Sequence, residues 1–159
     1  MDAHETAILT LEAASAVVDA ALAAGRAHAM MPLTVAVLDA GGHLVAFKRE
    51  TGSGILRPEV AIGKAWGALG MGIPTRLLRD RLADRPAFQN ALAAASHGRL
   101  IPVPGGVLVH NAAGHVIGAV GISGDTSDKD EYCAIAGVKA AGLHPDPAEP
   151  APAWMDSRL

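Results

Sequence analysis

The side chains best suited to chemistry gather where an apolar run ends, in residues 121–131, which read GISGDTSDKDE. Four carboxylates follow the glycines: Asp125, Asp128, Asp130 and Glu131. A helix N-terminus attracts anions through unpaired N–H groups and its dipole, and these carboxylates already fill that position. Ser127 and Asp130, three residues apart, are typical of a capping box. The pattern disfavours a phosphate-binding turn and offers acceptors for a donor, a hydroxyl, a cation or a partner's basic side chain.

Basic side chains occur earlier, around a second predicted helix start. Arg57 and Glu59 flank that start, and Lys64 follows within AIGKAWGAL. A lysine on an apolar helix face usually extends its amine to water, whereas an amine turned inward needs a carboxylate. The junction offers three: Asp125, Asp128 and Glu131. One hypothesis is a pocket in which Arg57 or Lys64 binds a ligand carboxylate and an acidic residue orients a donor or acts as general acid or base.

Three glycine-marked segments could meet at such a pocket: residues 52–59, 102–109 and 121–128. Loops of this kind often carry binding groups, although their glycines can equally serve turns with positive φ. The predicted ligand-binding residues are Arg57, Glu59, Lys64, Gly105, Gly106, Gly124, Asp125, Thr126, Asp128 and Glu131. In an enzyme, Lys64, Glu59 and Asp125 would be the catalytic candidates.

Well-known catalytic and metal-binding motifs are absent from the sequence. It contains no nucleophile elbow, P-loop, dinucleotide fingerprint, paired zinc histidines or haem-attachment CxxCH. The acidic segment lacks the glycine and terminal glutamate of a calcium loop, so no metal site is predicted. His43 and His115 follow similar turn sequences, DAGGH and NAAGH, and are interpreted as solvent-facing turn residues. Cys133, the only cysteine, is interpreted as a small buried side chain.

Composition indicates one globular domain. The chain has 159 residues, of which 50% are hydrophobic and 18% charged, and a net charge of -3. These values favour a packed core and disfavour nucleic acid or an anionic membrane as partner. The first nine residues contain Asp2 and Glu5 but no Lys or Arg, which predicts no signal peptide and a cytoplasmic location. Aromatic residues make up only 3%, so helices and sheet are expected to approach closely.

Apolar spacing and turn residues predict an α+β fold. Helices are expected at 10–29, from Pro58 to about residue 71, at 75–83, at 86–96 and at 127–141, with Thr10 as the first cap. Strands are expected at 33–38, 44–50, 99–103, 106–110 and 115–123. They should form an antiparallel sheet with helices on both sides. Residues 1–144 are predicted to be one domain, and residues 145–159 a proline-rich tail that does not pack.

Three segments, in this order, closely resemble the GlcG/HbpS family of haem-binding and haem-associated proteins, which includes the C-terminal domain of PduO proteins. They are VAVLDAGGHLVAF, PEVAIGKAWGALGMG and PVPGGVLVHNAAGHVIGAVGISGDTSDKDE. The resemblance covers about residues 8–143. It implies a profilin-like α/β/α sandwich around a five-stranded antiparallel sheet, a homo-oligomer, and haem or a related tetrapyrrole as ligand. Members occur beside genes for hydroxy-acid, diol or aromatic breakdown, which implies a role in small-molecule catabolism.

The residue chemistry leaves three functions open. The first is binding of haem, with His97, Met71 or Cys133 as the least exposed-looking iron ligands. The second is a cofactor-free isomerase, tautomerase or hydratase acting on a carboxylated intermediate of aromatic or hydroxy-acid catabolism, because the charged segments suit a small polar acid. The third is an assembly or accessory subunit.

Overall fold

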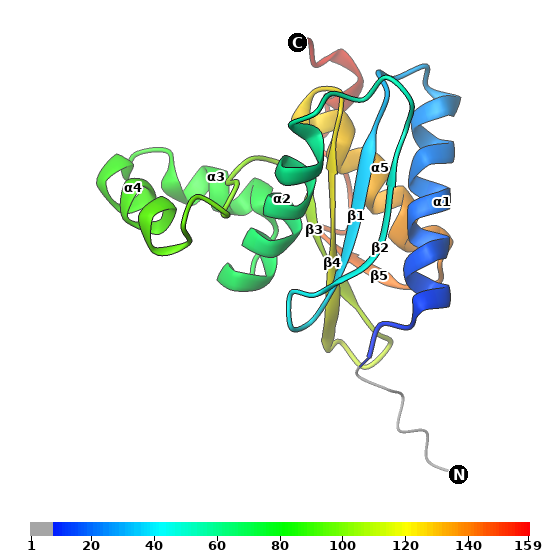
Figure 1. The fold of residues 1–159 in the computed structure, drawn as a ribbon, viewed down its shortest axis with the longest axis horizontal. Helices are drawn as coiled ribbons and strands as arrows, with labels where there is room; N and C mark the ends of the chain where they lie inside the picture. Colours follow the sequence, from blue (N-terminus) through cyan, green and yellow to red (C-terminus); the bar gives the residue numbers. More distant parts are fainter. Residues whose placement is uncertain (1–7) are drawn as a thin grey trace.

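A five-stranded antiparallel sheet forms the centre of the molecule, with helices on both faces (Figure 1). The computed structural model describes residues 8–159. The strands run in the order β2-β1-β4-β3-β5. Their bounds are Thr34–Asp39 (β1), Leu44–Arg49 (β2), Gly106–His110 (β3), Val116–Ser123 (β4) and His144–Asp146 (β5). The predicted α+β sandwich is confirmed.

The helices divide between the two faces of the sheet. The bounds are Leu11–Ala27 (α1), Arg57–Met71 (α2), Thr75–Leu82 (α3), Pro86–Ala95 (α4) and Ser127–Ala140 (α5), with a short 3-10 helix at Trp154–Asp156 (η1). α1 and α5 cover one face, α2 lies on the other, and α3 and α4 extend away from the sheet (Figure 1). Within residues 8–159, no helix is both long enough and apolar enough to cross a membrane.

Small residues let α2 lie directly on the central strand β4. A Cβ added at Gly121 of β4 would lie 1.9 Å from the carbonyl oxygen of Ala61 and 2.8 Å from the backbone nitrogen of Ala65, both in α2. No side chain fits at that distance, so glycine at 121 sets the separation between helix and sheet. This contact is the close approach that the low aromatic content predicts.

The fifth strand is not the one that the sequence predicts. Residues 99–103 form no strand; they lie against α2, where Ile101 N–H donates to the Gly63 carbonyl at 3.4 Å. Pro102 and Pro104 lack the N–H groups that a strand between neighbours would need. Leu100 instead packs with Leu78 and Leu82.

The tail beyond residue 144 was predicted not to pack, and this is wrong. β5 pairs with β3 at the edge of the sheet, where Pro145 is tolerated because one side of the strand has no partner. Further along, the Trp154 ring stacks on Tyr132 of α5, with centroids 3.7 Å apart. The proline-rich segment therefore contains a short edge strand and an aromatic residue that packs on α5.

The helix caps agree with the sequence at α1 and differ at α5. Thr10 accepts from Ala13 N–H at 3.1 Å, as predicted. At α5 the cap is Thr126, which accepts from Lys129 N–H, and not Ser127. The helix is thus capped one residue earlier than predicted, and Asp130, which is 1% exposed, accepts from the Asp125 N–H at 3.0 Å.

The two similar turn sequences form similar hairpin turns. Asp39 Oδ1 accepts from His43 N–H at 3.0 Å, and Asn111 Oδ1 accepts from His115 N–H at 2.9 Å. Both histidines are exposed, as the sequence predicts. The shared residues thus reflect the same turn chemistry used twice.

Candidate functional site

A buried ion pair joins α2 to α5. Lys64 turns inward, and its Nζ donates to Asp130 Oδ2 at 3.0 Å and to the Ile122 carbonyl oxygen at 2.8 Å. The two side chains are 2% and 1% exposed. Burial lowers the pKa of Lys64 and raises the pKa of Asp130, and each partner opposes the shift of the other. An inward lysine does find a carboxylate here, but that carboxylate is Asp130 and not one of the three predicted.

Gly105 and Gly106 make room for this lysine and its helix. Gly105 has φ +118, and a Cβ there would lie 2.9 Å from Lys64 Nζ. A Cβ on Gly106 would lie 2.3 Å from the Lys64 carbonyl oxygen. These glycines, both predicted as ligand-binding, are therefore placed against the protein's own backbone and lysine.

Asp125, just before α5, hydrogen-bonds the segment that precedes β1. Its carboxylate accepts from Met31 N–H at 2.9 Å and Thr126 N–H at 2.8 Å, and Lys129 Nζ lies 3.5 Å away. Burial alone would raise its pKa, but these donors lower it below the usual value. Neighbouring Gly124 packs closely, since a Cβ there would lie 2.4 Å from the Pro32 carbonyl oxygen.

Glu131 is fully buried on the same helix. Its Oε2 lies 3.4 Å from Nε of Arg76, which comes from α3. No residue in 8–159 donates a hydrogen bond of good geometry to either carboxylate oxygen. Burial raises the pKa of Glu131 to about 7, although Arg76 lowers it. Asp128, one turn earlier, is partly exposed and lies 4.0 Å from Nη1 of Arg79.

The first turn of α2 places the two remaining candidates differently. Arg57 Nη1 donates to Ser123 Oγ at 3.1 Å, so the guanidinium lies against the end of β4. Glu59 is exposed and lines a pocket on the outer side of α2. Of the ten predicted site residues, Glu59 is the one that lines this pocket.

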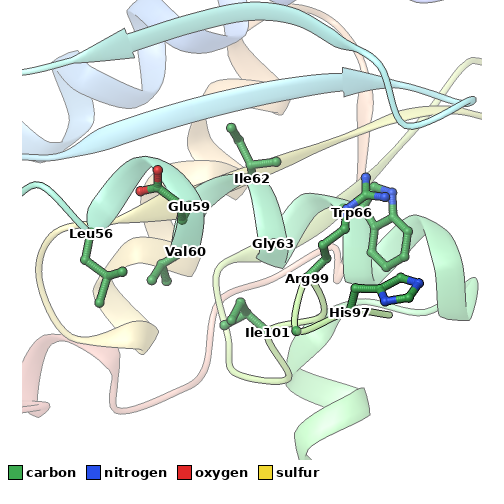
Figure 2. Close-up of a pocket in the computed structure, with 10 residues that line it drawn as sticks. Leu56, Glu59, Val60, Ile62, Gly63, Trp66, His97, Arg99 and Ile101 are labelled. Atoms are coloured by element: carbon green, nitrogen blue, oxygen red, sulfur yellow. The ribbon is translucent and has the colours of Figure 1, made fainter. Parts of the chain in front are cut away.

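The pocket lies between α2 and the segment 97–101 and has a volume of about 390 Å³. Its walls are Leu56, Glu59, Val60, Ile62, Gly63, Trp66, His97, Gly98, Arg99 and Ile101. Figure 2 shows Leu56 and Val60 towards one end and Trp66, Arg99 and His97 together at the other. The pocket is thus a largely apolar groove with an imidazole and a guanidinium at one end.

The guanidinium and the imidazole are held by local structure. The Arg99 guanidinium lies over the Trp66 ring, 4.1 Å from its centroid. His97 has φ +54, a left-handed conformation that few residues other than glycine adopt. The turn that ends α4 therefore aims residues 97–99 at the groove.

Trp66 and Arg99 are not among the predicted site residues, because the sequence pattern assigns residues 99–103 to a strand. A signal was available in α2, where Gly63 and Gly67 are four residues apart and share one helix face. A Cβ on Gly63 would lie 2.5 Å from the Arg99 carbonyl oxygen, and one on Gly67 would lie 3.3 Å from Cγ of Leu100. A stripe of small residues on a helix indicates that another segment lies against it.

Comparison with protein families gives a match over residues 9–139 to the family described as haem degrading protein HbpS-like. The chain belongs to the HbpS-like family. The match includes the groove and the buried Lys64–Asp130 pair, and it ends before β5 and the tail. A comparison with curated proteins found no match.

Solved structures share the HbpS-like fold. A crystal structure of HbpS is 32% identical, with a TM-score of 0.72, covering 83% of this chain and 89% of that one. A double mutant of HbpS from Streptomyces reticuli is 31% identical, with a TM-score of 0.71, covering 83% of this chain and 86% of that one. A PduOC–haem complex is 25% identical, with a TM-score of 0.77, covering 86% of this chain and 96% of that one.

The three possible iron ligands lie in different surroundings in this HbpS-like chain. His97 is exposed and lines the groove, contrary to its interpretation as a least exposed residue. Met71 is half-buried and packs against the cluster of Leu78, Leu82 and Leu100. Cys133 is fully buried, with its Sγ 3.4 Å from Met30 Sδ, and burial raises the pKa of its thiol to about 12. Cys133 is therefore a core residue, as its sequence context predicts.

Proposed function

We propose that the groove between α2 and residues 97–101 binds haem or a related tetrapyrrole. The observation that carries this proposal is the position of His97 at one end of an apolar groove in an HbpS-like chain. Iron in haem takes an axial ligand such as histidine and needs an apolar slot for its ring. Both are present on the same side of α2.

The walls of the groove suit a flat apolar ring. Leu56, Val60, Ile62 and Ile101 supply aliphatic surface, and the indole of Trp66 closes one end. The volume of about 390 Å³ is within the range of small-molecule sites. Leu56 is 66% exposed in the single chain, so the groove is open at this edge.

His97 and Arg99 would hold the two polar parts of the ligand. His97 would ligate the iron through its imidazole, and the left-handed turn after α4 places the residue at the groove. Arg99 would bind a propionate through the N–H groups at the edge of its guanidinium, since Trp66 covers one face of it. Haem, when bound, supplies iron-centred redox chemistry.

Two comparisons support haem as the ligand class. PduOC, which shares this fold, has been crystallised as a haem complex. The description of the matching family names haem degradation. Degradation of haem requires that haem is bound, and the groove supplies residues for this binding.

The proposal is tested by titrating the protein with haemin and recording the visible spectrum. A stoichiometric shift of the main absorption band is expected for the wild type. His97→Ala should remove the shift, whereas His115→Ala should leave it intact because His115 is exposed at the distant β3–β4 turn. An unchanged spectrum in His97→Ala would show that the iron is held elsewhere, and Met71→Ala is then the next variant to titrate.

A cofactor-free enzyme acting on a carboxylated metabolite is the second candidate. Among its proposed catalytic residues only Glu59 lines the groove. Lys64 and Asp125 are bonded to other protein groups. Loss of turnover in Glu59→Gln, with folding intact, would favour this candidate.

We also propose that the protein assembles as a homo-oligomer in the cytoplasm, in association with small-molecule catabolism. Ile55 and Leu56, which precede α2, are 96% and 66% exposed. Apolar side chains this exposed next to a groove are typical of surfaces covered by a partner. Light scattering of Ile55→Asp should show a smaller particle than the wild type, while equal sizes would argue against this surface.

A further inference from the structure

The segment after β5 crosses α5 and α3 and is attached by a few polar and aromatic contacts. Trp154 stacks on Tyr132, and Ser157 Oγ hydrogen-bonds Thr126 Oγ1 at the cap of α5. Glu149 pairs with Lys139 at 2.8 Å, and its carbonyl accepts from Arg76 Nη2 at 2.9 Å. Figure 1 shows residues 154–159 at the end of the molecule where α5 begins.

This segment lies over the most deeply buried unsatisfied group among the described residues. Glu131 is 0% exposed, and neither of its carboxylate oxygens accepts a hydrogen bond of good geometry from residues 8–159. The backbone N–H of Ala151 faces this carboxylate from the segment and lowers its pKa. Arg76 contacts both Glu131 and the segment. The segment therefore helps to keep the carboxylate from water.

The covering segment is itself a surface element. No residue of the fully described range 147–159 is buried, whereas Glu131 beneath it is. The family match ends at residue 139, so this segment lies outside the shared domain. A strip of chain with exposed side chains and few contacts opens at low free-energy cost compared with core elements.

We propose that residues 147–159 form a reversible strap, closed over the Arg76–Glu131 pair at low pH and released as the pH rises, so that release uncovers a carboxylate and a guanidinium on α5 and α3. Closing the strap removes the Glu131 carboxyl from water, which favours its neutral form. In the open state the carboxyl is solvated and returns towards the ordinary pKa of about 4.3. The closed state therefore binds the proton more tightly, and raising the pH favours the open state.

The charged groups around Glu131 also affect its pKa, and so the pH at which the strap opens. Arg76 and Arg79 on α3 favour the ionised carboxylate, as does Lys64 on α2, while Asp128 opposes it. Lys64 is itself neutralised by Asp130, and Arg76 is partly exposed. With the pKa of Glu131 at about 7 in the closed state, closing should weaken roughly tenfold between pH 6 and pH 8.

Hydrogen exchange of the full-length protein tests the strap without any ligand, so its outcome is independent of haem binding. The reporters are the amides of Trp154, Asp156 and Ser157, which donate hydrogen bonds within the closed strap. After correction for chemical exchange, they should lose about tenfold in protection between pH 6 and pH 8. Glu131→Gln cannot ionise and should show equal protection at both values. Glu12→Gln, a change at an exposed glutamate of α1, is the matched control and should behave as wild type.

Two results would overturn the proposal. One is a wild-type strap with equal protection at pH 6 and pH 8, and the other is a Glu131→Gln strap that keeps the wild-type pH dependence. Should Glu131→Gln fail to fold, Trp154→Ala provides a second test, because it removes the aromatic anchor and keeps Glu131. Carbon NMR of the glutamate carboxyls should then show the pKa of Glu131 falling from about 7 towards its ordinary value, and an unchanged pKa would reject the strap.

Discussion

Lys64 Nζ lies 3.0 Å from Asp130 Oδ2, and this ion pair is closed off from solvent between α2 and α5. The same ammonium also donates to the Ile122 carbonyl, while Asp130 Oδ1 accepts from Asp125 N–H at 3.0 Å. The pair therefore joins a helix on one face of the sheet to the turn that begins the helix on the other. We therefore expect the Lys64–Asp130 pair to contribute mainly to the stability of the folded protein.

Breaking this pair should destabilise the protein strongly. Lys64→Met leaves the Asp130 carboxylate buried without its cation, which typically costs about 3–5 kcal/mol. Urea denaturation should show this loss. Lys48→Met, which removes the exposed pair with Asp19, should change the free energy of unfolding by about 1 kcal/mol or less. Equal losses in the two variants would contradict a structural role for Lys64.

Two glycines should respond in opposite directions to alanine. Gly121→Ala places a Cβ 1.9 Å from the Ala61 carbonyl oxygen, so α2 must move away from β4, and a loss of at least about 1–3 kcal/mol is expected. Gly70→Ala adds a methyl group where no atom lies within 4 Å, and alanine favours the helix by roughly 0.5–1 kcal/mol. Thermal denaturation should therefore give a lower Tm for the first variant and a higher Tm for the second.

Arg99 should recognise a carboxylate of the ligand. If it binds a porphyrin propionate, Arg99→Ala should weaken binding of haem by roughly two- to fivefold, as is usual for an exposed ion pair. The dimethyl ester of haem has no such carboxylate, so its affinity should be the same in wild type and variant. Arg85, whose guanidinium lies 4.5 Å from the Phe88 ring centroid, has a similar stacking contact outside the groove. Arg85→Ala is therefore the control, and a loss of haem affinity there equal to that of Arg99→Ala would rule out specific recognition.

Stability should fall as the pH rises towards neutrality because of Glu131. Its folded-state pKa of about 7 is above the ordinary value near 4.3, so the folded protein holds this proton more tightly than the unfolded chain. The stabilisation is complete below about pH 4 and is lost as the pH rises through 7, amounting to about 3.5 kcal/mol at 1.36 kcal/mol per pKa unit. Urea denaturation of wild type and Glu131→Gln between pH 5 and pH 8 measures the difference. Parallel profiles for the two proteins would show that Glu131 does not titrate in this range.

The fold was largely predictable because its signals are local. The spacing of apolar residues in 10–29 and 127–141 predicts α1 and α5, and the turns at Gly42 and Gly114 mark the hairpins. The same pattern predicts an antiparallel sheet with helices on both sides, and resemblance to a known family added its profilin-like form. Residues 99–103 and 144–146 were misassigned because strand formation there depends on which neighbours are available, and local sequence does not contain that information.

The candidate site was less predictable. The sequence identifies Arg57, Lys64 and Asp125 as charged residues near glycines, but not the direction in which their side chains point. Lys64 and Asp130 meet because α2 lies directly on Gly121 of β4 and α5 begins just beyond the end of that strand. One oxygen of Asp130 accepts from the Asp125 N–H and the other from Lys64, a double role that depends on the placement of two helices.

The sequence by itself determined the five helices, four of the five strands, the family and the small residues that permit close packing, because these signals lie within a few turns of chain. The tertiary structure alone decided that His97, Arg99 and Trp66 share a groove and that the tail covers Glu131. Such contacts join segments that are far apart in sequence. These contacts depend on where α2, α3 and α5 lie relative to the sheet. The packing of the whole domain sets those positions.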